Sequence, residues 1–235
     1  MAPEIGISNT IPFQMNVRAI SGSSAFEYTA IDNSFSMEFD GVAYYDTENL
    51  NTLNGTQDAT VCCWFKKGTS SSTTPGQMIS TVGTSIRDHG IALRLRPSDS
   101  RLDYSFGFPP PPGSSGYTSA TITNVTDTNW HHVAIVIDRA ALTTTSYFDG
   151  AKVATSNPNN YSMSGLYYGF RIGARAQDGD KGFIGHVDEV AVFASKLSEE
   201  TIKAIYDATA NNPGKVADLS ETPEGAPAAW YRMGD

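Results

Sequence analysis

The chain has few cysteines that could cross-link it and few basic residues that could bind nucleic acid. It has two cysteines, Cys62 and Cys63, and they are adjacent. Neighbouring strand residues point to opposite faces, so a bridge between these two would be strained. We therefore expect two buried thiols and no disulfide framework, which suits folding in a reducing compartment.

Basic residues are scarce. Lysine and arginine total 16 against 25 acidic residues, which gives a formal net charge of −9. Nucleic acids and anionic membranes attract chiefly clusters of basic residues, and the sequence contains no such cluster. No apolar run reaches transmembrane length, and the first residues lack a basic region followed by an apolar one. We therefore expect neither a nucleic-acid nor a membrane partner.

Helical patterns are also scarce. The 235 residues contain one strong helical pattern, whereas Gly, Ser, Thr and Asn are abundant. This composition favours all-β structure with many turns, in one large domain with a short extension. The sequence predicts strands in the first half through its β-prone and alternating segments: Phe35–Phe39, Ala59–Lys67, Met78–Val82, Ile91–Arg96, Leu102–Phe108 and Ser119–Val125.

The second half carries the clearest local signals. Trp130–Asp138 is apolar on both faces, as in a central strand. Asp149-Gly150 joins two β-prone runs and predicts a tight hairpin. Gly182–Phe193 is the last long strand, and Leu197–Tyr206 is a short amphipathic helix in which Ser198 is the N-cap.

These segments, read in order as WHHVAIVID, YFDG, GFIGHVDEVAVF and KLSEETIKAIY, resemble the second half of a laminin-G-like domain. The resemblance implies an antiparallel jelly-roll β-sandwich of the concanavalin A-like kind with one short C-terminal helix. We expect residues 1–33 to form an N-terminal arm, 34–207 the sandwich, and 208–235 a linker and a strand. That strand either completes this sandwich or begins a further repeat.

The resemblance also implies a structural Ca²⁺, because sandwiches of this superfamily often hold one through oxygen ligands. The candidate ligands are Asp188 together with Asp40, and a second pair, Asp178 and Asp180. The alternative is that all four are ordinary turn and surface acids.

We expect no catalytic residues. The closely spaced carboxylates of the related glucanases are absent, and Asp188 and Glu189 are expected to point to opposite faces of their strand, as are His131 and His132. In IALRLR, Arg94 and Arg96 share a face. They either grip an anionic ligand or are solvated sheet residues paired with acidic neighbours.

Aromatic residues near the loops are the remaining candidates for ligand binding: Phe108, Tyr117 and Tyr161. The run Pro109–Pro112 beside them predicts a stiff exposed connection.

The final residues, AAWYRMGD, resemble the joints of tandem structural proteins of marine bacteriophages. The sequence therefore favours a non-catalytic virion protein, of the capsid-decoration or tail-fibre type, made in a host cytoplasm and displayed on the particle. We expect a homo-oligomer that contacts other virion proteins through the N-terminal arm. The alternatives are a module of a surface protein that binds cell-surface glycan, and a polysaccharide-active enzyme with an unfamiliar site.

Overall fold

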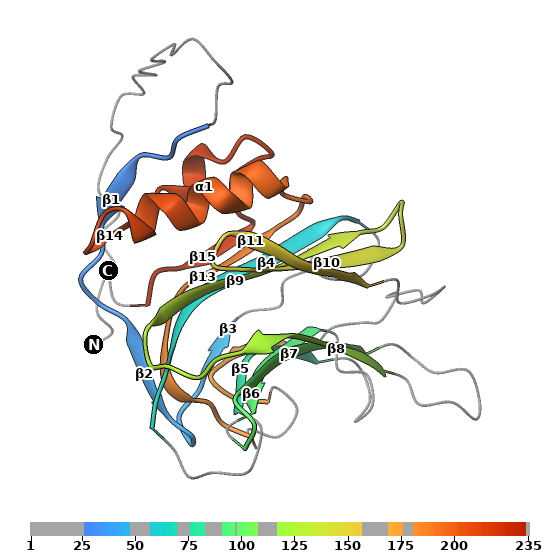
Figure 1. Ribbon diagram of the computed structural model, residues 1–235, viewed down its shortest axis with the longest axis vertical. Coiled ribbons are helices and arrows are strands. Elements are labelled where there is room, and N and C mark those ends of the chain that lie inside the picture. The colour runs from blue at the N-terminus through green and yellow to red at the C-terminus, as the bar shows by residue number, and fades with distance from the viewer. Residues whose placement is uncertain are drawn as a thin grey trace, which may run out of the picture.

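The computed structural model describes residues 26–47, 57–69, 76–82, 91–96, 98–107, 117–156, 169–175 and 181–233. Within these ranges two antiparallel sheets face each other, and a helix lies across the outside of one of them (Figure 1). The predicted jelly-roll sandwich with one short C-terminal helix is confirmed. None of the described helices is long and apolar enough to span a membrane.

The first sheet has seven strands in the order β11-β10-β9-β4-β13-β15, with β2 also paired to β13. Their bounds are β2 Met37–Asp40, β4 Ala59–Lys67, β9 Trp130–Asp138, β10 Thr143–Phe148, β11 Ala151–Ser156, β13 Ile184–Phe193 and β15 Ala229–Tyr231.

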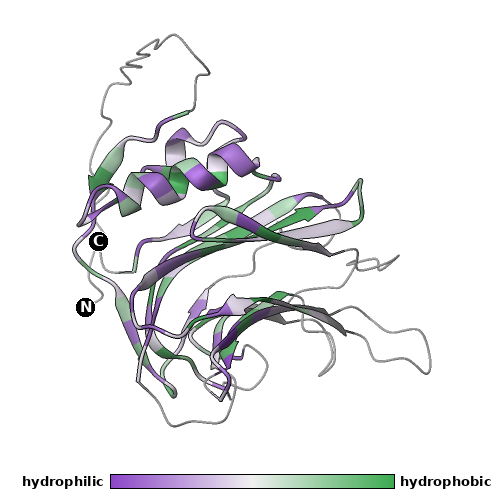
Figure 2. Ribbon diagram, viewed as in Figure 1, coloured by the Kyte–Doolittle hydropathy of each residue, from purple (hydrophilic) through white to green (hydrophobic). Residues whose placement is uncertain are grey.

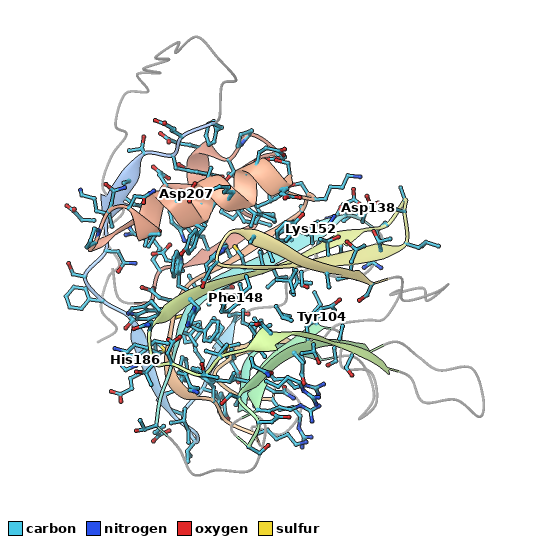
Figure 3. The ribbon with its side chains drawn as sticks, viewed as in Figure 1. Tyr104, Asp138, Phe148, Lys152, His186 and Asp207 are labelled. Atoms are coloured by element: carbon cyan, nitrogen blue, oxygen red, sulfur yellow. The ribbon has the colours of Figure 1, made fainter. Side chains whose placement is uncertain are left out.

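The second sheet has six strands in the order β3-β12-β5-β6-β7-β8. Their bounds are β3 Tyr45–Thr47, β5 Gly76–Val82, β6 Ile91–Arg96, β7 Arg101–Gly107, β8 Tyr117–Asn124 and β12 Gly169–Ile172. The main core lies between the sheets, and the side chains of Tyr104 and Phe148 point into it from opposite layers (Figure 3).

The helix α1, Glu199–Ala210, begins where the sequence predicts, because the Ser198 hydroxyl accepts the Thr201 N–H as an N-cap. It runs four residues beyond the predicted end. Hydrophilic and hydrophobic residues both occur along it, as an amphipathic helix requires (Figure 2). Its buried residues Ile202 and Ile205 join a second core with Cys62, Ala134 and Phe193 on the outside of the seven-stranded sheet.

The two ends of the described chain meet beside α1. Strand β1, Ala30–Asp32, pairs with β14, Lys215–Ala217, and the short 3₁₀ helix η2, Leu219–Glu221, follows. Tyr28 packs in the second core, and its hydroxyl hydrogen-bonds Thr222 at 3.0 Å. Residues 26–33, the described part of the predicted arm, therefore pack on this chain. Strand β15 pairs with β13, the arrangement expected of a strand that completes this sandwich.

Together, α1 and these terminal segments cover much of the outer face of the seven-stranded sheet. The outer face of the six-stranded sheet lies on the other side of the molecule (Figure 1).

Candidate functional site

Strands β6 and β7 place four charged residues on the outer face of the six-stranded sheet. Alternation along β6 sends Leu93 and Leu95 into the core, and along β7 it sends Leu102 and Tyr104 there. The residues between them therefore point outward. The antiparallel register sets Arg94 opposite Asp103 and Arg96 opposite Arg101. We call Arg94, Arg96, Arg101 and Asp103 the arginine face.

The three arginines converge on one carboxylate. Arg94 Nε donates to Oδ1 of Asp103, and Arg96 Nε donates to Oδ2 at 2.6 Å. Arg101 Nε lies 3.5 Å from the same Oδ2, as an ion pair, and 3.8 Å from Asp99. Asp103 is 3% exposed in its side chain, whereas Arg96 and Arg101 are 30% and 34% exposed. The carboxylate therefore anchors cationic groups whose outer parts are open to solvent.

The arginine face has more donors and more positive charge than its own acids use. A guanidinium carries five N–H donors in a planar fork. In the described residues Arg94 and Arg96 use only Nε in their contacts with Asp103, which leaves their Nη groups to other partners. Even when Asp99 is counted, the face has three cationic side chains and only two anionic side chains paired with them. The arrangement can therefore hold oxygen-rich groups by hydrogen bonds.

Another arginine of this sheet is committed to structure. Arg171 in β12 holds Asp46 through Nε at 2.5 Å and Nη2 at 2.8 Å, and its Nη1 donates to the carbonyl of Arg175. Its guanidinium lies 3.6 Å from the centroid of the Tyr44 ring. These contacts fix the edge strand β3, so Arg171 differs from Arg94 and Arg96 in having its fork occupied.

The predicted calcium ligands Asp40 and Asp188 are not brought together. Asp40 pairs with Ile184, four residues from Asp188 along β13, which is about 13 Å at ~3.3 Å per residue. The Asp40 carboxylate accepts the N–H groups of Ala43 and Val42, which lower its pKa. Among the described residues no group of three or more His, Cys, Asp or Glu side chains is arranged to hold a metal ion. The calcium stays a prediction.

The other predicted site residues lie where their side chains are not described. Asp178, Asp180, Phe108 and Tyr161 fall outside the described residues, and Tyr117 begins β8 without a described side chain. Their roles as metal ligands and ligand-binding aromatics therefore stay predictions.

The prediction that Asp188 and Glu189 point to opposite faces is wrong. The pairing of β13 with β4 shifts register between Asp188 and Ala191, and Glu189 adopts a positive φ of 50°. This bulge breaks the two-residue alternation. One amide nitrogen, Asn33 Nδ2, donates to Oδ2 of Asp188 and to Oε1 of Glu189, both at 2.9 Å. The two carboxyl groups therefore lie on the same side of β13.

Glu189 is buried beside that second carboxylate. Its Oε2 accepts the indole N–H of Trp230 at 2.5 Å, and Arg232 Nε lies 3.4 Å from Oε1. Burial, and then the charge of Asp188, raise the pKa of Glu189 to about 7, although Trp230 and Arg232 oppose the rise. With 4% and 6% exposure, Glu189 and Asp188 are closed to a large substrate.

The histidines do point to opposite faces, as predicted. His131 packs against Phe148 in the main core, and its Nδ1 lies 2.8 Å from Asp149 Oδ2. This hydrogen bond raises the pKa of His131. His132 packs against Trp64 on the helix side, where burial lowers its pKa to about 4. Their separation excludes a shared metal ion.

The fold places the chain among jelly-roll β-sandwiches, and a family model gives the narrower assignment. The model of the concanavalin A-like lectin/glucanases superfamily, Laminin_G_3, matches residues 39–203. The chain belongs to this family. A comparison with the curated proteins finds no match.

Solved structures share the fold at low sequence identity. The CBM40 domain of a Ruminococcus gnavus IT-sialidase, bound to α2,3-sialyllactose, is 15% identical with a TM-score of 0.60, covering 74% of this chain and 97% of that one. A putative carbohydrate-binding protein from Bacteroides ovatus is 18% identical with a TM-score of 0.56, covering 89% of this chain and 53% of that one. The pentraxin of Limulus polyphemus is 14% identical with a TM-score of 0.52, covering 86% and 90%.

Proposed function

We propose that this chain is a non-catalytic carbohydrate-binding domain that holds its glycan on the arginine face. The observation that carries the proposal is the set of Nη donors on Arg94 and Arg96 that their contacts with Asp103 leave over, on an outer face away from α1. Sugars present many hydroxyl and ring oxygens that accept hydrogen bonds, and the planar guanidinium fork donates to oxygens with defined geometry.

The comparisons support a carbohydrate as the ligand. The CBM40 domain and the Bacteroides ovatus protein are both described as carbohydrate-binding structures of the same fold. Because a fold alone does not fix function, the proposal depends on this chain's own donors.

The described acids support binding without turnover. A retaining glycoside hydrolase needs two carboxyl groups that reach the glycosidic bond about 5 Å apart. Asp188 and Glu189 have carboxyl groups on the same side of β13, but both are buried and hydrogen-bonded to Asn33. They lie on β13 in the other sheet, so they do not face a glycan on the arginine face.

A glycan array tests this function. We expect the wild-type protein to bind a subset of immobilised glycans, and Arg94→Gln/Arg96→Gln to lose that binding by at least about 10- to 100-fold, because even one charged hydrogen bond contributes ~1.5–3 kcal/mol. The matched control is Lys152→Gln/Lys203→Gln, which removes the same charge from the opposite layer (Lys152 is labelled in Figure 3). Equal binding by both double variants and wild type would place the glycan elsewhere.

A virion component remains a prediction, and so do the homo-oligomer and contacts with virion proteins through residues 1–33. The described part of the arm, residues 26–33, packs against its own chain, and residues 1–25 lie outside the described residues. Co-purification of the natural protein with phage particles would support that role, and a glycan-binding domain displayed on a particle would satisfy both proposals.

A further inference from the structure

The arginine face contains a buried donor that its own residues do not satisfy. Arg101 Nε is buried and forms no hydrogen bond among the described residues, although it lies 3.5 Å from Oδ2 of Asp103 as an ion pair. That oxygen already accepts from Arg96 at 2.6 Å. Native proteins rarely leave a charged donor buried without a hydrogen-bond acceptor, because a long ion pair offsets only part of the cost of its desolvation.

The positive charge of the arginine face also exceeds the negative charge of the acids paired with it. Asp103 is shared among three guanidinium groups, and in the described part of the chain the only other acid paired with them is Asp99, half exposed and 3.8 Å from Arg101. The positive excess is local, since the chain as a whole has a net charge of −9. Because charges more than about 10 Å apart are largely screened at ~0.1 M salt, an anionic group on a sugar at this face meets chiefly the local positive excess.

The geometry of the guanidinium donors indicates the chemical class of ligand that they bind. Guanidinium groups bind carboxylate and sulfate oxygens through paired, parallel N–H···O bonds, and such charge-assisted bonds are about twice as strong as neutral ones. Asp103 holds Arg94 and Arg96 by Nε, on the inner edge of each fork, so the Nη groups are already oriented before a ligand arrives. Preorganised donors of this kind lose little entropy on binding.

We propose that the arginine face is an anion-selective site that takes a sugar carrying a carboxylate or sulfate group, with Arg94, Arg96 and Arg101 contacting the anionic group and Asp103 positioning them. This inference rests on the proposed carbohydrate-binding function and names the ligand class of the same site.

Paired glycans test the inference. The probes are oligogalacturonate and the same oligomer with its carboxyl groups reduced, and a sulfated galactan oligomer with its desulfated form, measured by calorimetry. We expect one charged member to bind about 10- to 100-fold more tightly than its neutral counterpart, because it gains one or more charge-assisted bonds. Preference in the first pair identifies a carboxylate ligand, and preference in the second identifies a sulfate. Weaker binding at higher ionic strength accompanies either preference.

The outcomes separate the two proposals. If charged and neutral members bind equally and Arg94→Gln/Arg96→Gln abolishes both, the anion selectivity is wrong and carbohydrate binding at this face stands. If binding occurs but ignores that double variant, the location in the proposed function is wrong, and with it the inference.

A second measurement does not depend on the choice of glycan. The Nε–Hε resonances of Arg94, Arg96 and Arg101 are followed by NMR during titration with sodium sulfate, against sodium chloride at equal ionic strength. We expect saturable shifts with sulfate only, and no matching shift at Arg171, whose fork is occupied by Asp46. Identical responses to both salts would overturn the inference even if none of the four oligomers binds.

Discussion

Stability is expected to fall by about 2–3 kcal/mol as the pH rises from about 5 to about 8, through Glu189 alone. Its pKa is about 7 in the folded protein and 4.5 ordinarily. Each unit of difference corresponds to ~1.4 kcal/mol. Between these two values the folded state binds the proton and the unfolded state has lost it, so folding is favoured at the lower pH and the contribution disappears as the pH rises through 7.

The measurement is the free energy of unfolding by urea, at several pH values, for the wild type and for Glu189→Gln. The substituted glutamine keeps the side-chain shape and cannot ionise, so we expect the stability difference between the two proteins to change with pH over this window. His131, whose pKa is also raised, titrates in both proteins and cancels in the difference. Asp40→Asn, which alters an acid in an exposed turn, should keep the wild-type slope. A difference that stays constant across the window would contradict the buried state of Glu189.

Replacing Gly185 by alanine is expected to cost about 3–5 kcal/mol of the free energy of unfolding, the sum of backbone strain and overpacking. Gly185 lies in β13 between β2 and β4, opposite Phe39 on one side and Lys67 on the other. Its φ is 139°, and a Cβ there would lie 2.2 Å from the carbonyl oxygen of Lys66. That oxygen belongs to the backbone of a central strand, so it cannot move aside without disturbing β4.

Gly214→Ala is the matched control. Its φ of 77° is also positive, but nothing lies within 4 Å of the added Cβ, so only the backbone strain of about 1 kcal/mol remains. The measurement is the free energy of unfolding of both variants, by heat or by urea. If the two variants lose similar stability, the close approach of β4 to Gly185 is not what the structure indicates.

The parts of the fold that could be predicted are those encoded by neighbouring residues. Trp130–Asp138 is apolar on both faces and forms the interior strand β9. Asp149-Gly150 has the positive φ values of 48° and 74° that its turn requires, and Ser198 caps the helix that follows it. Each signal needs only a few residues of sequence, and each is present in the structure.

Only part of the candidate site can be predicted from the sequence, because the rest depends on the register of the paired strands. Alternation in IALRLR put Arg94 and Arg96 on one face, and the same alternation in RLDYSFG would have put Arg101 and Asp103 on a face of their strand. Nothing local says that the two strands pair with Arg94 opposite Asp103.

The prediction for the Asp188–Glu189 pair is wrong for a related reason. Regular alternation separates adjacent residues, but the bulge at Glu189 is stabilised by Asn33, far earlier in the chain, and by Trp230, well after it. Such long-range hydrogen bonds have no signature in the sequence around the bulge.

The central claim is that this chain binds a glycan on the outer face of its six-stranded sheet. The most direct measurement is to map backbone amide shifts by NMR while the glycan that binds most tightly on the array is added. We expect the largest shifts in β6 and β7, around Arg94, Arg96 and Asp103, with little change in α1 or β10. Shifts that gather on the seven-stranded sheet or α1 instead, with β6 and β7 unchanged, would contradict the account.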